Sequence, residues 1–222
     1  MRFACLVVLL VATGTSEGCC PPPQFESRAA GRGLELSENG GDPYSGYSRL
    51  YHDEKKGKYV KDVKVEFEKA GKVTLFVLED YAGGRRYTVL NGNCSVKPLT
   101  GDFNRELCVK QSDYKGKAVL GLNDDLLPMD LYAVNYSNPD YDIYGEAVVL
   151  PISEGRCMRQ TEMINARVKS KLVAVESAVV FNTTTSISDP SIFDIPKECK
   201  GNLHLKKVPP FNLNLHAIKI RL

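Results

Sequence analysis

The sequence has 222 residues, a formal net charge of +2 and 43% hydrophobic residues. So small a charge excludes an extended nucleic-acid surface, which needs clustered Lys and Arg, and the KKGK run at residues 55–58 is expected to be solvated. The chain is long enough to bury one sizeable core, and no internal repeat or low-complexity linker divides it. These properties predict a single globular domain.

The N-terminus has the layout of an export signal. Arg2 precedes an apolar run from Phe3 to Ala12 that is too short to span a bilayer, and small residues follow it. This arrangement predicts a signal peptide over residues 1–16, cleaved between residues 14 and 18. No second apolar run reaches the ~20 residues of a membrane span. We therefore expect a secreted, extracellular protein without a membrane span; delivery to the lysosomal lumen remains an open alternative.

Cysteines and glycosylation sequons agree with export. Cys5 leaves with the signal peptide, and an even set remains: Cys19, Cys20, Cys94, Cys108, Cys157 and Cys199. In an oxidising compartment such a set predicts a disulfide framework. Adjacent cysteines bond each other only through a strained ring, so each N-terminal cysteine is expected to reach a distant partner. Candidate glycosylation sites are Asn93, Asn135 and Asn182.

The first strand signals follow a segment of turn-forming residues. Residues 28–48 are rich in Gly, Ser, Asn and Pro and are expected to form an irregular loop. "DVKVEFEK", residues 62–69, alternates apolar and charged side chains and predicts a half-buried strand. Residues 72–90 predict a hairpin that turns around Gly83-Gly84. Its outgoing run, residues 73–78, is apolar on both faces and indicates a central strand covered on each side.

The second half of the chain predicts more strands and little helix. Residues 158–170 fit a helix or a strand equally well, and that alternative stays open. The other segments carry strand patterns separated by turns, which is typical of an antiparallel β protein. These strands are expected at residues 117–122, 131–136, 146–152 and 171–183.

The sequons suggest which side of two strands faces the core, because a glycosylated Asn must face water and side chains alternate. If Asn135 faces out, its neighbours on the strand point inward, and these are Tyr132, Val134 and Tyr136. If Asn182 faces out, Glu176 does too. The inward set of that strand is then Val173, Val175, Val179 and Phe181.

Residues that would indicate catalysis are missing. The histidines, His52, His204 and His216, have no metal-ligand spacing and are interpreted as isolated surface residues. No nucleophile, phosphate-loop or dinucleotide motif occurs, so we expect no enzyme and no organic cofactor. Acidic clusters offer weak candidate ligands for Ca²⁺, although solvated turns explain them more simply. Those candidates are Asp124, Asp125, Asp140 and Asp142.

Three segments resemble the ependymin family. "CCPPPQFESR" near the mature N-terminus is similar to its Cys-x-x-Pro-x-x-Trp/Phe-Glu-x-Arg opening, and "NCSVKPL" is similar to its Cys-Ser segment. "DPSIFDIPKEC", residues 189–199, resembles its Asp-Pro-Ser-x-Phe-x-x-Pro-x-x-Cys signature and is the most specific. The chain departs from the family in having Phe25 where many members carry Trp, and in Cys108 and one N-terminal cysteine. The resemblance covers residues 19–199 and leaves 200–222 as a C-terminal extension, packed on or trailing the domain.

The resemblance implies a fold and a class of function. The implied fold is two stacked, curved antiparallel sheets, a half-open barrel or sandwich, around a deep apolar pocket, as in bacterial lipoprotein carriers. The implied protein is a secreted or lysosomal glycoprotein, usually a homodimer. The family is associated with Ca²⁺ binding, cell–matrix adhesion and lipid binding, and not with enzymatic activity.

The resemblance also implies a disulfide pattern. The N-terminal cysteine pairs with Cys157, Cys94 pairs with Cys199, and Cys108 is left for the other member of the vicinal pair. Which of Cys19 and Cys20 takes which partner stays open, although spacing slightly favours Cys19 for Cys157. A bond at Cys94 would hinder glycosylation within its sequon, so Asn93 ranks below the other two sites.

The leading hypothesis is a non-enzymatic binder of a lipid or another hydrophobic small molecule. Its pocket would be lined by the inward side chains of the predicted strands. The candidates are Val65, Phe67, Leu75, Val77, Tyr132, Val134, Val175, Val179 and Phe181. The alternative is an extracellular adhesion or signalling glycoprotein that depends on Ca²⁺ and glycans and contacts the matrix.

Overall fold

The computed structural model describes residues 18–38, 40–101, 103, 108–122, 125–137 and 141–200. The expected signal peptide lies outside these ranges, and so do residues 201–222 of the expected extension, Asp124 and Asp140. Within the described ranges, no helix has the length and hydropathy needed to cross a membrane.

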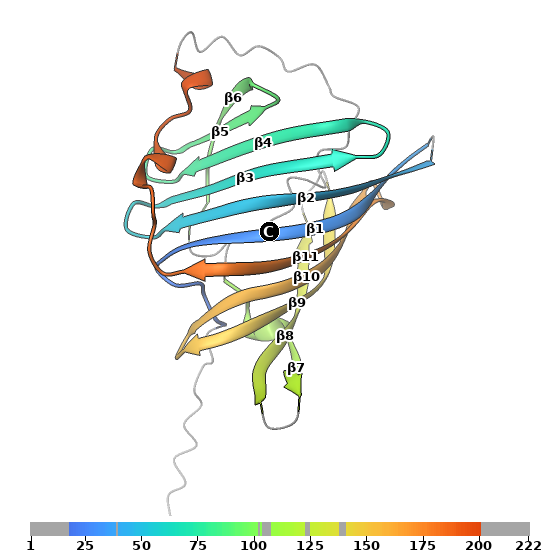
Figure 1. Ribbon diagram of the computed structural model, residues 1–222, viewed down its shortest axis with the longest axis vertical. Coiled ribbons are helices and arrows are strands. Elements are labelled where there is room, and N and C mark those ends of the chain that lie inside the picture. The colour runs from blue at the N-terminus through green and yellow to red at the C-terminus, as the bar shows by residue number, and fades with distance from the viewer. Residues whose placement is uncertain are drawn as a thin grey trace, which may run out of the picture.

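The described residues form one antiparallel sheet with the strand order β6-β5-β4-β3-β2-β1-β11-β10-β9-β8-β7 (Figure 1). Three short 3₁₀ turns accompany the strands: η1 (Gln111–Asp113), η2 (Pro190–Phe193) and η3 (Lys197–Cys199). The strands are β1 (Gln24–Ser37), β2 (Gly40–Asp53), β3 (Lys58–Phe67), β4 (Gly71–Asp80), β5 (Arg85–Leu90), β6 (Asn93–Pro98), β7 (Tyr114–Leu122), β8 (Asp125–Ser137), β9 (Asp142–Ser153), β10 (Arg156–Val168) and β11 (Lys171–Thr184).

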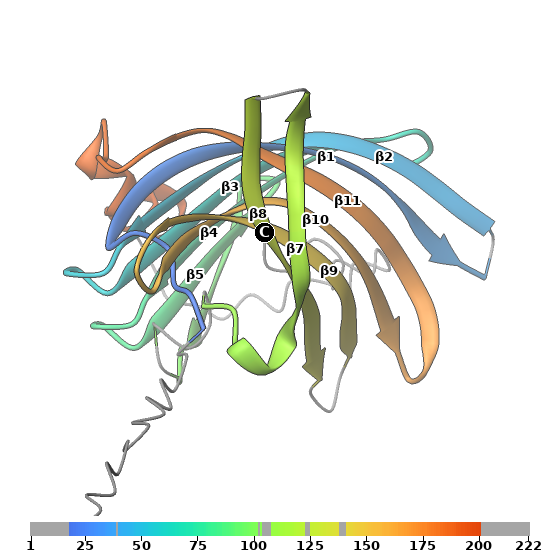
Figure 2. The same cartoon turned by 90° about the horizontal axis from the view of Figure 1, so that it is seen from below.

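One continuous sheet replaces the two stacked sheets that were expected. The pairing of β1 with β11, in which Ala29 lies opposite Val180, joins the N-terminal six strands to the C-terminal five. Local patterns predict hairpins between neighbouring strands, but this pairing joins distant parts of the chain and leaves no local signal. Seen from below, the strands bow into an arch over a concave side (Figure 2). The mainly β, antiparallel part of the prediction is therefore confirmed.

The expected loop at residues 28–48 is wrong, because β1 and β2 form a long hairpin there. Its glycines serve close packing between strands. A Cβ on Gly46 would lie 2.5 Å from the Lys64 carbonyl oxygen, and one on Gly33 would lie 2.5 Å from that of Val175. Only glycine permits such an approach, so a composition that usually marks a loop here belongs to tightly paired strands.

The other predicted strands are present. The β4–β5 hairpin has its turn at residues 81–84, and β3 contains the alternating "DVKVEF". Residues 158–170 lie mostly in β10, which resolves the open alternative in favour of a strand. Strand β4 lies between β3 and β5, and its Leu78 is fully buried, as expected for a central strand.

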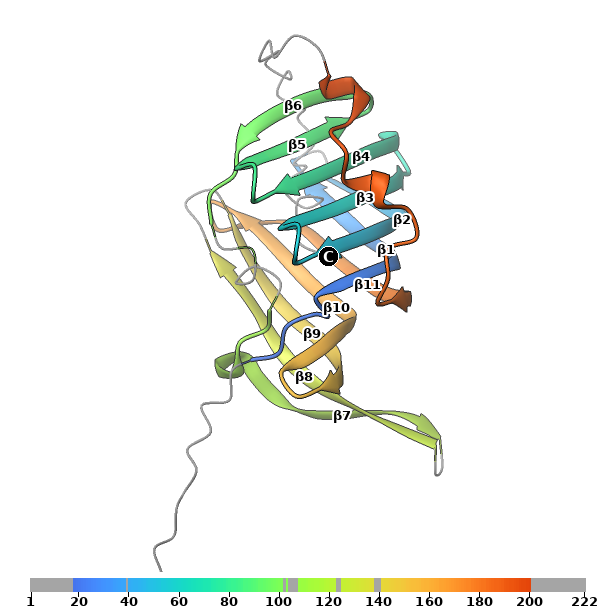
Figure 3. The same cartoon turned by 90° about the vertical axis from the view of Figure 1, so that its left-hand side faces the viewer.

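The two faces of the sheet differ. We call inner the face that carries Tyr59, Lys61, Val63, Val65 and Phe67 of β3 together with their lateral partners, and outer the opposite face. Four of the five apolar clusters lie on the inner face. The fifth lies on the outer face, where residues 187–199 cover β3, β4 and β5 (Figure 3). The inner face therefore holds most of the core.

Candidate functional site

The inner face collects most of the residues that the sequence placed in a pocket. Two of its clusters lie far apart along the sheet, one on β2–β4 and one on β9–β11. The β2–β4 cluster contains Tyr44, Val63, Val65, Phe67, Val73 and Leu75. Six of the nine pocket candidates belong to the inner face by register: Val65, Phe67, Leu75, Val77, Tyr132 and Val134.

The three candidates on β11 are on the wrong side. Val175, Val179 and Phe181 belong to the outer face, where Val179 is 50% exposed and Phe181 is 37% exposed. Glu176, expected to face water, is buried on the inner face. The predicted facing of β11 is wrong because the strand is irregular at Asn182. This residue has a positive φ of 50°, and the register between β1 and β11 shifts next to it, between Glu26 and Arg28 of β1. This bulge places two consecutive residues on the outer side, so the orientation of Asn182 does not carry back along the strand.

On β8 the same reasoning agrees with the structure. Asn135 is exposed, Tyr132 is buried and Val134 is half-buried on the inner face, while Tyr136 lies toward the strand end and is exposed. Asn93 and Asn182 are exposed as well. Exposure makes the three Asn side chains accessible, and their glycosylation stays a prediction.

A group of buried polar residues occupies the middle of the inner face. We call Tyr44, Lys61, Glu162 and Glu176 the polar centre. The Tyr44 hydroxyl donates a hydrogen bond to Glu176 Oε2 (3.0 Å), and Arg159 Nη1 donates one to Glu162 Oε2 (2.8 Å). Lys61, Glu162 and Glu176 are each at most 8% exposed. The Tyr44–Glu176 hydrogen bond joins β2 to β11 and so links the two halves of the sheet.

Burial governs the titration of this centre. Burial raises the pKa of Glu162 and of Glu176, and it lowers the pKa of Lys61. The negative charges of Glu176 and Glu162 act on Lys61 in the opposite direction and partly offset the lowering of its pKa. These two residues lie three and four strands away from Lys61 in the sheet order.

Sequence reasoning missed the polar centre because none of its members stands in a motif. Lys61 lies one residue before the alternating stretch "DVKVEF", on the apolar side of the pattern, and Glu176 was assigned to water. The one local signal was Lys61 itself, a charged residue on the side of the strand where the alternating pattern places apolar residues.

Histidine 52 is also buried, contrary to the surface interpretation. Its ring stacks between Phe25 (centroids 5.2 Å apart) and Phe103 (4.8 Å), and its Nδ1 has no hydrogen-bond partner in the described structure. Burial lowers the pKa of His52 to about 4, so the imidazole is neutral at neutral pH. It is a packed aromatic ring on the inner face.

The described residues contain no group of three or more His, Cys, Asp or Glu that could hold a metal ion. Of the Ca²⁺ candidates, Asp125 begins β8 and Asp142 pairs with Ser137 at the opposite end of that strand. Asp142 accepts a hydrogen bond from Ser137 Oγ, which is typical of turn chemistry. The two described carboxylates therefore do not form one site.

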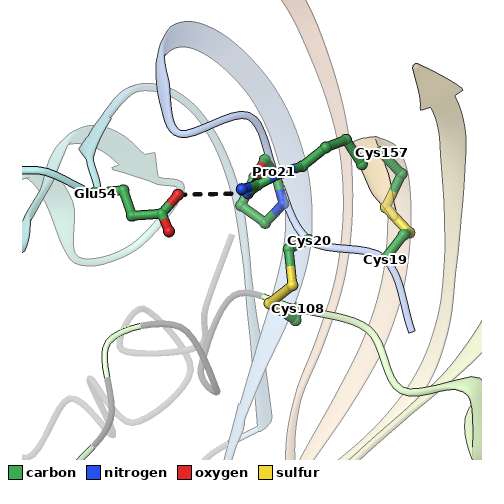
Figure 4. The surroundings of a disulfide bond; sticks show 7 residues. Cys19, Cys20, Pro21, Glu54, Cys108 and Cys157 are labelled. Carbon is green, nitrogen blue, oxygen red and sulfur yellow. Dashed lines mark hydrogen bonds and ion pairs between the residues drawn. A yellow bond between two sulfur atoms is a disulfide. The ribbon is translucent and has the colours of Figure 1, made fainter. Parts of the chain in front are cut away.

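Disulfides anchor the first and last segments that the structure describes. The bonds are Cys19–Cys157, Cys20–Cys108 and Cys94–Cys199, the set implied by the resemblance, with Cys19 as the partner of Cys157. Figure 4 shows the vicinal pair reaching in two directions. Backbone hydrogen bonds add to this anchor: Cys157 N donates to Cys20 O (2.9 Å), and Val109 N donates to Cys19 O (2.9 Å). The vicinal cysteines are structural.

Comparison with known proteins gives a family and two distant structural likenesses. The ependymin family model matches residues 69–199. A search of curated proteins found no match. A LolA superfamily protein from Nitrosomonas europaea is 13% identical, with a TM-score of 0.36, covering 80% of this chain and 92% of its own. A DUF1329 family protein from Desulfovibrio piger is 9% identical, with a TM-score of 0.32, covering 78% and 90%.

The family match spans more than half of the sequence and ends at Cys199, which bonds Cys94 within the same match. The signature "DPSIFDIPKEC" forms η2 and η3, and its Phe193 is buried against the outer face. The segments that carry the resemblance are thus the ones that fasten the C-terminal part of the domain to the sheet. The chain belongs to the ependymin family.

Proposed function

We propose that this protein is a secreted, non-enzymatic carrier that holds an apolar ligand, in the first place a lipid, against the inner face of its sheet. The observation that carries the proposal is the distribution of apolar side chains: four clusters on one face of a single curved sheet. Ligand sites of this kind are concave and mostly apolar, with a small number of polar groups that fix orientation. The polar centre supplies such groups.

A row of small residues across the inner face supports the same proposal. Along one row across the sheet, Glu162 is flanked by Ala147 and Ala178, and the row continues through Gly31 and Gly46. Small side chains in the middle of a curved sheet leave room that larger ones would fill. Apolar clusters on both sides of this row would contact the hydrocarbon part of a ligand.

Export is proposed on the disulfides and the family. Three disulfides in one domain are stable in an oxidising compartment and rare in the cytosol. Secretion with glycans at Asn135 and Asn182 is the form we propose; peptide mapping with and without glycosidase tests it. Calcium binding stays a prediction, which calorimetry on glycosylated and deglycosylated protein would test.

Native mass spectrometry of protein from a eukaryotic host is the direct test of the carrier. We expect a co-purified lipid, or uptake of added fatty acids at one per domain. Protein that neither retains nor takes up any lipid would overturn the proposal.

The absence of Trp from the sequence allows a test of position. Val134→Trp places a reporter on the inner face at a half-buried site, and Tyr47→Trp places one on the outer face, where Tyr47 is 71% exposed. A brominated fatty acid should quench the first reporter and leave the second unchanged. Equal quenching of both would indicate adsorption to the surface and would contradict a carrier with an inner site.

A further inference from the structure

The first strand in the sheet order, β6, has a neighbour on one side only. It pairs with β5, and no other strand among the described residues pairs with it. An unpaired edge presents backbone N–H and C=O groups to which another segment can hydrogen-bond, so proteins usually cover or blunt it. Lys97 and Pro98 blunt the end of this strand. Residues 93–96 are neither charged nor proline, so the first part of the edge is open to pairing.

The two sides of β6 differ in polarity at this edge. On the outer side Val96 lies opposite Tyr87, which lies opposite Leu78, and all three belong to one apolar cluster. Tyr87 and Leu78 are buried, whereas Val96 is only half-buried. On the inner side polar Ser95 lies opposite Thr88. A strand added here would therefore gain apolar contacts on its outer side and would need polar residues on its inner side.

The chain contains a segment with this pattern outside the described ranges. "FNLNLHA", residues 211–217, alternates apolar and polar residues at every position. Strict alternation of this kind predicts a strand with one apolar and one polar face. Its length is close to that of β6, which has six residues.

A disulfide places the beginning of this C-terminal segment beside the open edge. Cys199, in η3, is bonded to Cys94 of β6, and η3 contacts β6 and β5. Residues 201–210 can extend over about 33–36 Å, whereas a six-residue strand is about 20 Å long. Both ends of β6 are therefore within reach. The other edge of the sheet, at β7, stands at the opposite end of the strand order.

We infer that residues 211–217 add a strand to the open edge of β6, with their apolar side chains on the outer face. In strand addition, backbone hydrogen bonds supply the affinity and alternate side chains supply the selectivity. The added strand would extend the apolar cluster beyond Val96 and would close the edge to other chains. This chain's own segment is the favoured occupant because the Cys94–Cys199 bond keeps it at a high effective concentration beside the edge.

Hydrogen exchange measured by mass spectrometry on the full, disulfide-bonded chain tests the inference. The variant Leu213→Asn/Leu215→Asn removes apolar side chains from the added strand, and the matched control Asn212→Ser/Asn214→Ser changes only its polar side. We expect the amides of residues 93–98 to exchange at least about tenfold faster in the first variant, because the edge loses its partner. The control should leave their exchange unchanged.

A second measurement uses the absence of Trp from the sequence. Leu213→Trp places a reporter on the apolar side of the segment, and Asn212→Trp places one on its polar side. The first should emit at shorter wavelength and be quenched less by acrylamide than the second. Equal emission and equal quenching of the two reporters would contradict a docked strand.

Three exchange results would overturn the inference. The first is unchanged exchange of residues 93–98 in Leu213→Asn/Leu215→Asn. The second is protection of residues 93–98 that rises with protein concentration, since the added strand would then come from a second copy. The third is protection of residues 211–217 without any effect on residues 93–98, which would place the segment elsewhere on the protein. Lipid uptake is measured separately, so none of these results decides the carrier proposal.

Discussion

The two faces of the sheet are built from the same strands and follow opposite rules. The inner face buries nearly all of the apolar clusters and a set of charged residues among them. The outer face has one apolar cluster, under residues 187–199, and elsewhere carries exposed ion pairs such as Arg49–Asp62 together with exposed apolar residues such as Tyr47. Burial is therefore not limited to apolar residues on the inner face, and apolar residues are not always buried on the outer face. What decides burial is the curvature of the sheet and the segment that covers it.

The largest loss of stability is expected when residues 187–199 are no longer tied to the outer face. The Cys94–Cys199 bond closes a separation of 105 residues and ties η3 to β6. For a loop of this length, the chain-entropy estimate of the stabilisation is about 4–5 kcal/mol. We expect the Cys94→Ser/Cys199→Ser double variant to lose an amount of this order in unfolding free energy, measured by urea titration.

The Cys20→Ser/Cys108→Ser variant provides a comparison for this effect. It opens a shorter separation of 88 residues, so a nearly equal loss is expected from loop entropy alone. A loss below about 1 kcal/mol for the Cys94–Cys199 pair would show that residues 187–199 stay in place without the bond.

A pair of phenylalanines tests burial on the outer face. Phe193 is 3% exposed and packs on Tyr51, Val60 and Leu78, whereas Phe181 on the same face is 37% exposed. Phe193→Ala should cost about 3–4 kcal/mol of unfolding free energy through lost burial and the cavity it leaves. Phe181→Ala should cost less than about 1 kcal/mol. The reverse order would place Phe181 in the core, as the sequence pattern had suggested.

The fate of Phe181 shows what sequence could predict here and what it could not. Alternation predicted β3, and apolar runs between turn signals predicted β4, β5, β8 and β9, although β8 begins at Asp125, well before the predicted stretch 131–136. Alternation fixes which side chains share a face only while the register is unbroken. The bulge at Asn182 reversed the assignment of β11, and nothing in the residue types marked it.

The long-range features were equally hidden. The pairing of β1 with β11, and the burial of Lys61 on the same face as Glu162 and Glu176, depend on the whole topology. The even set of cysteines predicted a disulfide framework, but the pairing was expected only because the chain resembles a family. The candidate site was thus half visible: its apolar wall on β3, β4 and β8 followed from pattern, and its polar centre did not.

Buried His52 on the inner face makes the stability of the protein depend on pH. An unfolded imidazole has a pKa of 6.5, and burial lowers the pKa of His52 to about 4. As pH falls below 6.5 the unfolded state binds a proton that the folded state resists, so stability decreases until about pH 4, by about 3 kcal/mol in total. We expect the contribution of His52 to the unfolding free energy to show this decrease across the range.

The variant His52→Phe isolates that contribution. It keeps an aromatic ring between Phe25 and Phe103 and removes the titrating group. Burial raises the pKa of Glu162 and Glu176, which acts in the opposite direction, since their folded carboxyls take up protons more readily as pH falls. The readout is therefore the difference between the two proteins, which should grow toward low pH. Parallel curves would show that His52 is not buried as a neutral ring.

The smallest effect is expected from the ion pairs of the outer face. Arg49 Nη2 lies 2.5 Å from Asp62 Oδ2, and the Arg49 side chain is 53% exposed. The Asp62 hydrogen bond raises the pKa of Arg49, which stays charged at any working pH. Water and salt screen such a pair, so Arg49→Ala should change the unfolding free energy by less than about 1 kcal/mol, and the change should shrink further at high salt. Thermal unfolding at low and high salt measures both. A loss that exceeds this bound and persists in salt would mean that Arg49 contributes through packing of its stem on the outer face, and that this face holds more of the fold's stability than its exposure indicates.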